Sequence, residues 1–243
     1  MTERLPPGGR IVTLTRDEWL RRLRFKRGEH ITIVGPTGCG KSFVAWQMLD
    51  KLTSPAFQGV VLVKKPRDEL ITRDAKRLHY RTVRSWPPPP NLWLARKPPG
   101  YVVWPRTNFT DVEADRLAKH VLFKRVLLDV YRKGRRIAYV DDAFGFSALL
   151  DLKEEMIELW TELRSMDGSL MTAFQRPSMV PLWAYSSAEH LLLFNDPDKR
   201  SRDRFAEIGG VDPDLIKATV QSLPQYHFVY IKRTGPRMCI VAP

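Results

Sequence analysis

Residues 35–42 read Gly-Pro-Thr-Gly-Cys-Gly-Lys-Ser, which fits the pattern G-x-x-x-x-G-K-[ST] of a phosphate-binding loop. The glycines allow the backbone to turn so that successive N–H groups face a phosphate, and the start of a following helix adds partial positive charge there. In this pattern the lysine reaches the β- and γ-phosphates of a nucleoside triphosphate, and the serine hydroxyl binds Mg²⁺. The candidates for nucleotide binding are Gly35, Pro36, Thr37, Gly38, Cys39, Gly40, Lys41 and Ser42, with Lys41 also catalytic and Ser42 also a ligand of Mg²⁺.

A second group of chemically active residues, Asp141 and Asp142, follows the apolar run at 137–140 directly. A phosphate-loop enzyme needs a carboxylate at a strand end beside the loop, where it holds Mg²⁺ opposite the loop hydroxyl. We expect Asp141 in that role, and we expect Asp142 to orient or deprotonate the attacking water. The alternative is that the two acids only end a strand and cap the following helix.

The acid pair and one missing motif indicate the class of nucleotide-binding protein. Two adjacent acids favour motor ATPases with an additional strand over Ras-like GTPases, which position water by other means. The chain also lacks the Asn/Thr-Lys-x-Asp pattern that reads guanine. We therefore expect ATP, together with Mg²⁺, to be the bound nucleotide.

The surrounding residues predict the elements that position these groups. The apolar run at 30–34 predicts a buried strand and residues 42–49 predict a helix, which is the context that a phosphate loop requires. Other strands are expected at 11–14, 60–63, 101–104, 137–140, 169–174 and 191–194, and helices at 15–23, 68–78, 111–131 and 148–166. The helix at 111–131 depends on the spacing of Leu117, Val121, Leu122, Val126 and Leu128. Strands alternating with helices predict an α/β fold with a mostly parallel sheet flanked by helices, closed by a C-terminal β-hairpin at 226–232 and 238–241.

The stretch 164–177, Arg-Ser-Met-Asp-Gly-Ser-Leu-Met-Thr-Ala-Phe-Gln-Arg-Pro, resembles the FtsK–HerA superfamily of DNA-pumping ATPases. Those proteins have an arginine, a short turn, an apolar strand and then Thr-Gln-Arg-Pro. Phe174 stands where they have threonine, while Gln175 is in place. Residues 194–210 and 223–232 are similar to the superfamily as well, and the resemblance covers roughly residues 28–233. It implies a RecA-like P-loop NTPase fold.

The resemblance also implies roles for three residues of this stretch. Gln175 would end a central strand near the γ-phosphate and sense it or the attacking water. Arg164 would project towards the ATP of a neighbouring subunit as an arginine finger, because a guanidinium stabilises charge on the transferred phosphoryl group. The alternative for Arg164 is a helix C-terminal cation that satisfies the helix dipole. Arg176 is a second candidate for the finger, and a structural role beside Pro177 is its alternative.

The chain is strongly basic, with 40 Lys and Arg residues against 27 Asp and Glu residues and a net charge of +13. The excess is concentrated at 64–106, where eleven basic residues stand against three acids. Such an excess indicates a polyanionic partner, either nucleic acid or a membrane surface; a basic surface kept for solubility is the alternative. Trp86 and Trp93 flank the proline run of this segment, and aromatic rings among basic residues can stack on bases.

The length of 243 residues suits one α/β domain with a full core. We expect a single P-loop ATPase domain over 1–243, with a lead-in at 1–29 and a basic, proline-rich insertion at 64–106. Long apolar runs are absent, which predicts no integral membrane segment, and the first residues lack the apolar core of a signal peptide. The two cysteines, Cys39 and Cys239, fit a reducing cytoplasm.

These observations predict an ATP-driven DNA motor subunit for translocation, packaging or mobilisation. By resemblance to the superfamily, the partners would be copies of the same chain, in a homo-oligomeric ring expected to be hexameric. Basic loops would bind DNA, expected to be double-stranded, through phosphates and without reading sequence. The alternative is a phage-morphogenesis or secretion ATPase that acts on protein or membrane. A small-molecule kinase with the same loop is disfavoured by Gln175, Arg176 and the acid pair.

Overall fold

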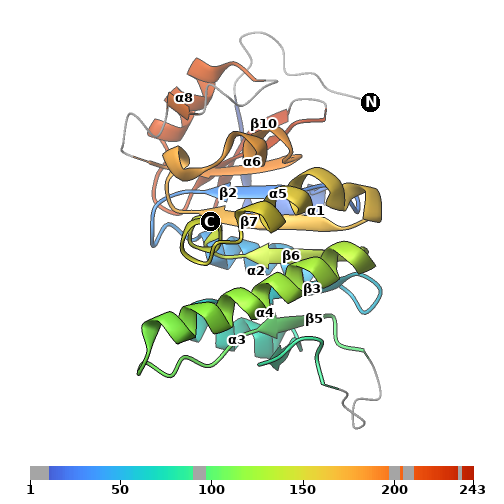
Figure 1. The fold of residues 1–243 in the computed structure, drawn as a ribbon. Helices are drawn as coiled ribbons and strands as arrows, with labels where there is room; N and C mark the ends of the chain where they lie inside the picture. The colour runs from blue at the N-terminus through green and yellow to red at the C-terminus, as the bar shows by residue number, and fades with distance from the viewer. Residues whose placement is uncertain (1–10, 90–96, 197–202, 205–210, 235–236) are drawn as a thin grey trace.

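The computed structural model describes residues 11–89, 97–196, 203–204, 211–234 and 237–243, and Figure 1 shows one sheet with helices on both faces. The strands are β1 (Val12–Thr15), β2 (Ile31–Val34), β3 (Gln58–Leu62), β4 (Arg81–Val83), β5 (Gly100–Val103), β6 (Arg136–Val140), β7 (Ser169–Phe174), β8 (His190–Phe194), β9 (Phe228–Lys232) and β10 (Arg237–Ala242). The α-helices are α1 (Arg16–Arg22), α2 (Lys41–Leu52), α3 (Glu69–Arg77), α4 (Val112–Lys133), α5 (Lys153–Glu162), α6 (Leu182–Ser186) and α8 (Pro213–Gln221). Shorter turns are the π-helix η1 (Gly145–Leu149) and the 3₁₀-helices η2 (Leu163–Met166) and η3 (Pro177–Met179).

The ten strands form one sheet in the order β1-β10-β9-β8-β2-β7-β6-β3-β5-β4. From β8 to β4 all neighbours run parallel, whereas β9 pairs antiparallel with both β8 and β10. β7 lies between β2 and β6, so an additional strand separates the phosphate-loop strand from the strand that carries the acid pair. The expected α/β fold, with a mostly parallel sheet and a closing hairpin, is confirmed; residues 235–236 of the hairpin turn lie outside the described residues.

The sheet is buried because its strands are apolar on both faces. In β6, Ile137 and Tyr139 belong to the hydrophobic cluster that includes residues of α1, α2 and α3, while Ala138 and Val140 belong to the cluster that includes residues of α4, α5, α6 and α8. Strands of a parallel sheet that is covered on both sides have such continuous apolar runs. The result is a three-layer arrangement of helices, sheet and helices, which leaves the ends of the strands available for a functional site. We call the side of the sheet where the parallel strands begin the amino edge and the side where they end the carboxyl edge.

Local signals in the sequence account for several helix ends. α1 begins with a capping box, in which Thr15 and Glu18 each accept a hydrogen bond from the backbone N–H of the other. Asp111 caps the start of α4, and Gly134, with a φ of +57°, ends it. The helices expected at 15–23, 68–78 and 111–131 are therefore confirmed as α1, α3 and α4.

The single helix expected at 148–166 is wrong. The chain forms η1, α5 and η2 instead, and Asp151, with a φ of +50°, interrupts the helical path between the first two. Leu150 and Leu152, on either side of Asp151, are both buried. Packing of both side chains thus overrides the apparent helical spacing.

The spacing of apolar residues that predicted α4 also assigns some of the wrong residues to its buried face. Leu117 and Val121 are 62% and 47% exposed, whereas Phe123, Val126 and Leu127 are fully buried. Figure 1 shows that the first turns of α4 extend beyond the ends of the strands. Only the second half of this helix is therefore covered by the sheet.

The basic segment 64–106 contributes directly to the sheet. α3, β4 and β5 lie within it, and β5 pairs with both β3 and β4. Trp86 is buried, with its ring against Tyr101 and its Nε1 donating to Asp129, so this ring is part of the core and does not present a face to a base. Trp93 lies outside the described residues.

Candidate active site

The phosphate loop joins the end of β2 to the start of α2 at the carboxyl edge of the sheet. Gly38 and Gly40 have φ values of +82° and +102°, which glycine adopts without steric cost, and Gly40 is the N-cap of α2. The Lys41 ammonium donates to the carbonyl oxygens of Gly35 and Pro36, at 2.6 and 2.7 Å. Burial lowers the pKa of Lys41. The loop backbone and this lysine therefore form one tightly folded unit.

Ser42 and Asp141, the two expected ligands of Mg²⁺, are brought together across β7. The Ser42 hydroxyl donates to Asp141 Oδ1 at 2.7 Å, and the Tyr139 hydroxyl donates to the same oxygen at 2.6 Å. Lys65 Nζ lies 3.0 Å from Asp141 Oδ2. Burial alone would raise the pKa of Asp141, but the Lys65 charge and these hydrogen bonds hold it below its usual value.

This donor set suits Mg²⁺. An ionised carboxylate and a hydroxyl oxygen are ligands that Mg²⁺ accepts, and the ion commonly completes its shell with substrate phosphates and water. Among the described residues there is no group of three or more His, Cys, Asp and Glu side chains that could form a metal cage, and a phosphate-loop site does not require one. Ser42 and Asp141 would be its protein ligands.

Asp142 is held at both carboxylate oxygens. Lys64 Nζ lies 2.6 Å from Oδ2, and the backbone N–H of Gly145 donates to Oδ1 at 3.2 Å. A Cβ on residue 145 would lie only 2.0 Å from Lys64 Nζ, so glycine is needed for this close approach. Gly145 also begins η1, and π-helical turns are frequent at functional sites.

Sequence reasoning missed the role of Lys64 and Lys65, which it counted only as part of the basic segment. β3 and β6 are parallel neighbours in which Leu62 pairs with Val140, so the two lysines that follow β3 meet the two acids that follow β6. The matching spacing of two lysines and two acids after apolar runs was the available signal. The adjacency of β3 and β6 was needed to interpret it.

Gln175 and Arg176 follow β7 directly. Phe174 pairs with Val34, and its carbonyl oxygen accepts from Gly35 N at 3.1 Å, so Gln175 emerges beside the start of the phosphate loop. Both Gln175 and Arg176 are exposed. Because β7 lies between β2 and β6, Gln175 follows a strand that ends between the loop and the acid pair, and its contact with the γ-phosphate stays a prediction.

Arg164 lies at the opposite, amino edge of the sheet. It belongs to η2, which precedes β7, and its Cγ packs beside Gly28, which precedes β2. The six residues of β7 span about 20 Å, so this guanidinium is separated from the phosphate loop of its own chain. Within the described residues, the Arg164 side chain is exposed and makes no hydrogen bond or ion pair.

Part of the positive charge at 64–106 is neutralised by acids, both from within the segment and from other parts of the chain. Arg77 pairs with Asp50 and Asp74, and Lys64 and Lys65 pair with the acids that follow β6. Exposed cations that make no ion pair with described residues are Arg67, Lys76, Arg84, Lys97 and Arg106. Arg67, Arg84 and Arg106 follow the carboxyl ends of β3, β4 and β5, respectively.

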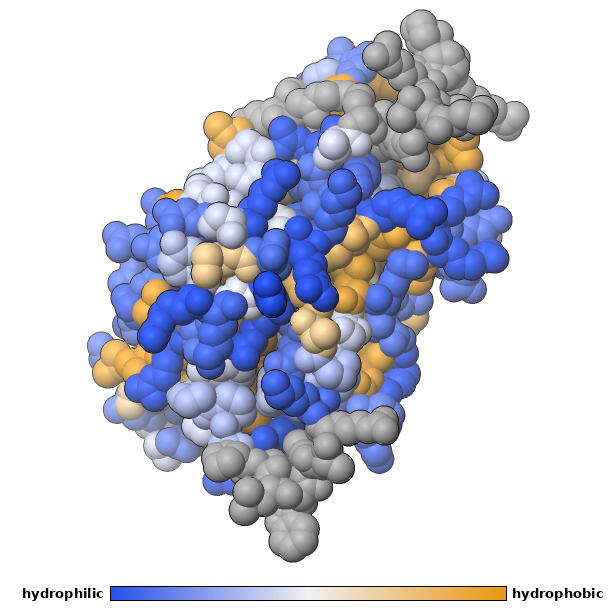
Figure 2. All heavy atoms as spheres, turned by 90° about the vertical axis from the view of Figure 1, so that its right-hand side faces the viewer, coloured by the Kyte–Doolittle hydropathy of each residue, from blue (hydrophilic) through white to orange (hydrophobic). Residues whose placement is uncertain are grey.

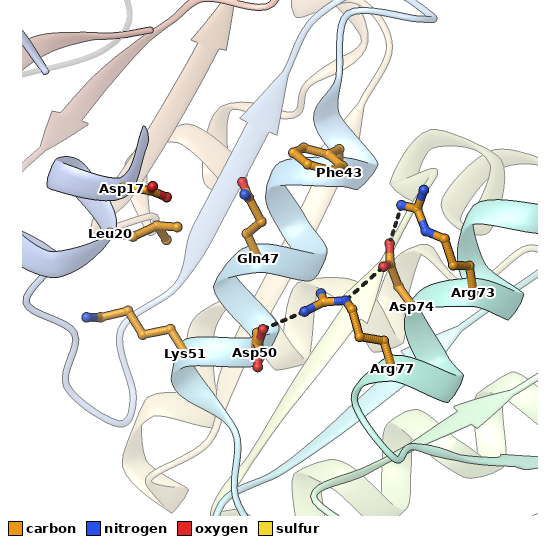
Figure 3. Close-up of a pocket in the computed structure, with 9 residues that line it drawn as sticks. All are labelled: Asp17, Leu20, Phe43, Gln47, Asp50, Lys51, Arg73, Asp74 and Arg77. Atoms are coloured by element: carbon orange, nitrogen blue, oxygen red, sulfur yellow. Dashed lines mark hydrogen bonds and ion pairs between the residues drawn. The ribbon is translucent and has the colours of Figure 1, made fainter. Parts of the chain in front are cut away.

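A groove of about 580 Å³ lies between α1, α2 and α3 and is distinct from the phosphate loop (Figure 3). The dashed lines in Figure 3 join Arg73 to Asp74, and Arg77 to Asp74 and Asp50. These arginines are therefore already paired within the groove wall. Phe43, in the first turn of α2, borders the end of the groove nearest to the phosphate loop.

Sequence comparison provides limited information. No model of a known protein family matches the chain. A stretch of 87 residues is 34% identical to the nitrate import ATP-binding protein NrtC of Synechocystis sp.. That match covers 33% of this chain and 12% of the relative, so the chain corresponds to a small part of NrtC. In the described part of the chain, no helix combines the length and apolar character needed to cross a bilayer.

Solved structures match most of the chain. The DNA-packaging ATPase B204 of Sulfolobus turreted icosahedral virus has a TM-score of 0.62 and 15% identity, over 90% of this chain and 99% of that one. VirB4 of Thermoanaerobacter pseudethanolicus has a TM-score of 0.61 and 11% identity, over 99% of both chains. The cytoplasmic domain of the type VII secretion ATPase EccC of Thermomonospora curvata has a TM-score of 0.55 and 15% identity, over 88% and 25%. The chain therefore shares the fold of these ATPases.

Proposed function

We propose that this protein hydrolyses ATP and that hydrolysis drives the movement of DNA by a ring of its subunits. The observation that carries the proposal is the set of groups gathered at the carboxyl edge of the sheet. The phosphate loop, Gln175 and the acid pair follow the three neighbouring strands β2, β7 and β6. Exposed arginines follow the next three strands, β3, β5 and β4.

Hydrolysis follows from the partners of each residue. Lys41 and the loop N–H groups bind the phosphates, and Mg²⁺, when bound by Ser42 and Asp141, neutralises charge on the β- and γ-phosphates. Asp142 orients the attacking water and accepts its proton, because Lys64 and Gly145 fix its carboxylate. The neutral amide of Gln175 contacts the γ-phosphate or the water.

Arg164 is proposed to act on the ATP of a neighbouring subunit. Its position at the amino edge excludes contact with the loop of its own chain, and its guanidinium is exposed and makes no ion pair with described residues. A guanidinium supplied by a neighbour stabilises the transferring phosphoryl group and makes turnover depend on assembly. Arg176 lies at the edge that carries the loop, so it is the candidate for action within one chain. We also propose that the ring contains six subunits.

DNA is the proposed polyanion, and the expected contact is with its phosphates. Arg67, Arg84 and Arg106 are exposed and follow strands that end at the same edge as the hydrolysis site, where a change at the nucleotide can be transmitted to bound DNA. Contacts of this kind carry no sequence information and are strongly sensitive to salt. We therefore propose binding to double-stranded DNA without sequence preference.

The test is ATPase activity with and without double-stranded DNA at low salt. DNA is expected to raise turnover of the wild type, and the combined change Arg67→Ala, Arg84→Ala and Arg106→Ala is expected to remove the increase. A plot of the logarithm of the DNA-binding constant against the logarithm of the salt concentration should also become less steep, by about 2.7 for three lost phosphate contacts. The matched control is Arg24→Ala, Lys26→Ala and Arg27→Ala, which removes the same charge before β2 at the amino edge. Equal effects of the two triple changes, or no stimulation by DNA, would contradict the proposal.

A second candidate function is an ATPase that acts on protein or membrane in secretion or assembly. It is supported by the shared fold with EccC and by exposed apolar side chains at the start of α4, where Phe109, Val112 and Leu117 are 67%, 80% and 62% exposed. Binding to anionic vesicles or to a protein substrate, without stimulation by DNA, would favour this candidate.

A further inference from the structure

Tyr226 presents an exposed aromatic ring beside the phosphate loop. It lies just before β9, and a Cβ on Gly40 would come within 3.6 Å of its Cδ1. The residue is 46% exposed. Its φ of +64° is uncommon for a bulky residue, and such conformations occur preferentially at functional sites.

Arg16 holds this unusual backbone in place from beneath the surface. Its Nη2 donates to the carbonyl oxygen of Tyr226 at 2.9 Å, and the residue is only 8% exposed. The guanidinium carbon also lies 5.5 Å from the centre of the Phe43 ring and 5.9 Å from that of Phe228. Tyr226 is therefore tied to the first turn of α2 through a buried cation, and its ring is left at the surface.

The order of the strands shows on which side of the loop a nucleoside must lie. The γ-phosphate end has to face the acid pair and Gln175, which follow β6 and β7 on one side of β2. The nucleoside must then extend towards β8 and β9, on the other side of β2. Phe194, at the end of β8, packs against Gly35, and Tyr226 lies just beyond it, next to Gly40.

We propose that the Tyr226 ring is the platform on which the base of the bound nucleotide stacks. This inference rests on the proposed binding of ATP and adds the part of the site that contacts the base. Aromatic rings bind bases through their faces, and the ligand class is therefore a nucleoside triphosphate, ATP under the proposed function, held by its base as well as by its phosphates. Phe43, an exposed aromatic residue on the helix that starts at the loop, is linked to this position through Arg16.

The proposal is tested by comparing a ligand that has a base with one that lacks it. Calorimetry with Mg²⁺ would measure binding of ATPγS and of inorganic tripolyphosphate to the wild type, Tyr226→Ala and Tyr226→Phe. Tyr226→Ala should weaken ATPγS binding about tenfold or more and leave tripolyphosphate binding within about twofold, because only the base loses a contact. Tyr226→Phe keeps the ring and should bind both ligands as the wild type does. Alanine also carries the steric cost of a positive φ, so a difference in binding between Tyr226→Ala and the wild type reflects the loss of the ring.

Phe109→Ala is the matched control, since Phe109 is also an exposed aromatic residue with a φ of +64°, but it follows β5. It should bind both ligands normally. Unchanged ATPγS binding by Tyr226→Ala, or an equal loss for both ligands, would overturn the proposal. Equal binding of tripolyphosphate and ATPγS by the wild type would overturn the base platform alone, whereas a wild type that binds neither ligand would show that the proposed nucleotide site itself is wrong.

Discussion

The acid pair and Arg164, which lie at opposite edges of the sheet, differ in their partners. At the carboxyl edge, Asp141 and Asp142 each hold a lysine, at 3.0 and 2.6 Å, and Lys41 is bound to its own loop. At the amino edge, the Arg164 guanidinium has no ion-pair partner among the described residues. Figure 2 faces that edge and shows a mostly hydrophilic surface around an apolar area.

Under the proposed function, this difference would divide the hydrolysis site between neighbouring subunits. The carboxyl edge contains the groups proposed to bind phosphate, metal and water, but the two lysines nearest to its acid pair are already engaged by those acids. At the amino edge, Lys232 pairs with Glu29 and Arg136 with Asp129, whereas Arg164 is left with no such partner among the described residues. Joining one edge to the other in a ring would complete each hydrolysis site, which is the simplest reason for an exposed arginine about 20 Å from its own phosphate loop. The following predictions test this comparison, starting with the largest expected effect.

Arg164→Ala should lower kcat of the assembled protein by about 10³- to 10⁵-fold while ATPγS still binds, because the transition state loses a cation. The sharper measurement mixes Arg164→Ala subunits with Lys41→Ala subunits, each inactive alone. Mixed rings contain interfaces with both an intact loop and an intact finger, so activity should partly return. Failure of the mixture to recover any activity, or normal turnover of Arg164→Ala, would contradict action on a neighbour. A mixture of Arg176→Ala and Lys41→Ala subunits should not recover activity in this way, because Arg176 lies at the same edge as the loop of its own chain.

Asp142→Asn should lower kcat by about 10²- to 10⁴-fold and leave ATPγS affinity close to that of the wild type, because the amide cannot accept the proton of water. Single-turnover measurements of phosphate release would check this. Asp151→Asn makes the same chemical change at an exposed aspartate and should be neutral. Normal turnover of Asp142→Asn would show that the acid serves only as a partner of Lys64 and a cap for η1.

Lys64→Met should lower kcat about ten- to a hundredfold with little change in ATP affinity, because Asp142 would lose the partner that fixes one carboxylate oxygen. Lys64→Arg retains a cation and should restore part of the activity. Lys76→Met removes an exposed lysine of the same segment and should leave kcat unchanged. The same loss in both methionine variants would instead indicate a general effect of charge.

The smallest expected effect is on the pH dependence of stability, and it involves His30 at the amino edge. Burial, and then the nearby Arg164 charge, lower the pKa of His30 to about 4 from the usual 6.5. The folded state thus keeps His30 neutral while the unfolded chain takes up a proton, so the free energy of unfolding falls as the pH decreases from 6.5 towards 4. Arg164→Ala should raise the pKa of His30 and reduce this loss by less than about 1 kcal/mol. Denaturant titrations at about pH 7 and about pH 5 would measure it, and an identical pH dependence in both proteins would contradict the proximity of the two charges.

Much of the fold could be predicted because neighbouring residues encode it. The capping box at Thr15, the apolar runs of the central strands and the strand–loop–helix pattern at 31–52 need no distant contact. The helix expected at 148–166 failed where packing of Leu150 and Leu152 decided the path of the chain. β4, the last strand in the sheet order, was not predicted, because its three residues are too few to show a recognisable strand pattern.

The sequence alone determined the chemistry that lies on single segments, namely the phosphate loop, the acid pair and the Gln175–Arg176 step after an apolar strand. Tertiary structure alone decided which segments meet. It joined Lys64 to Asp142, brought Tyr226 next to Gly40, and placed Arg164 at the edge opposite the loop. The physical reason is the strand order β8-β2-β7-β6-β3, which is set by crossover connections and by the packing of both sheet faces, and which no local pattern of residues encodes.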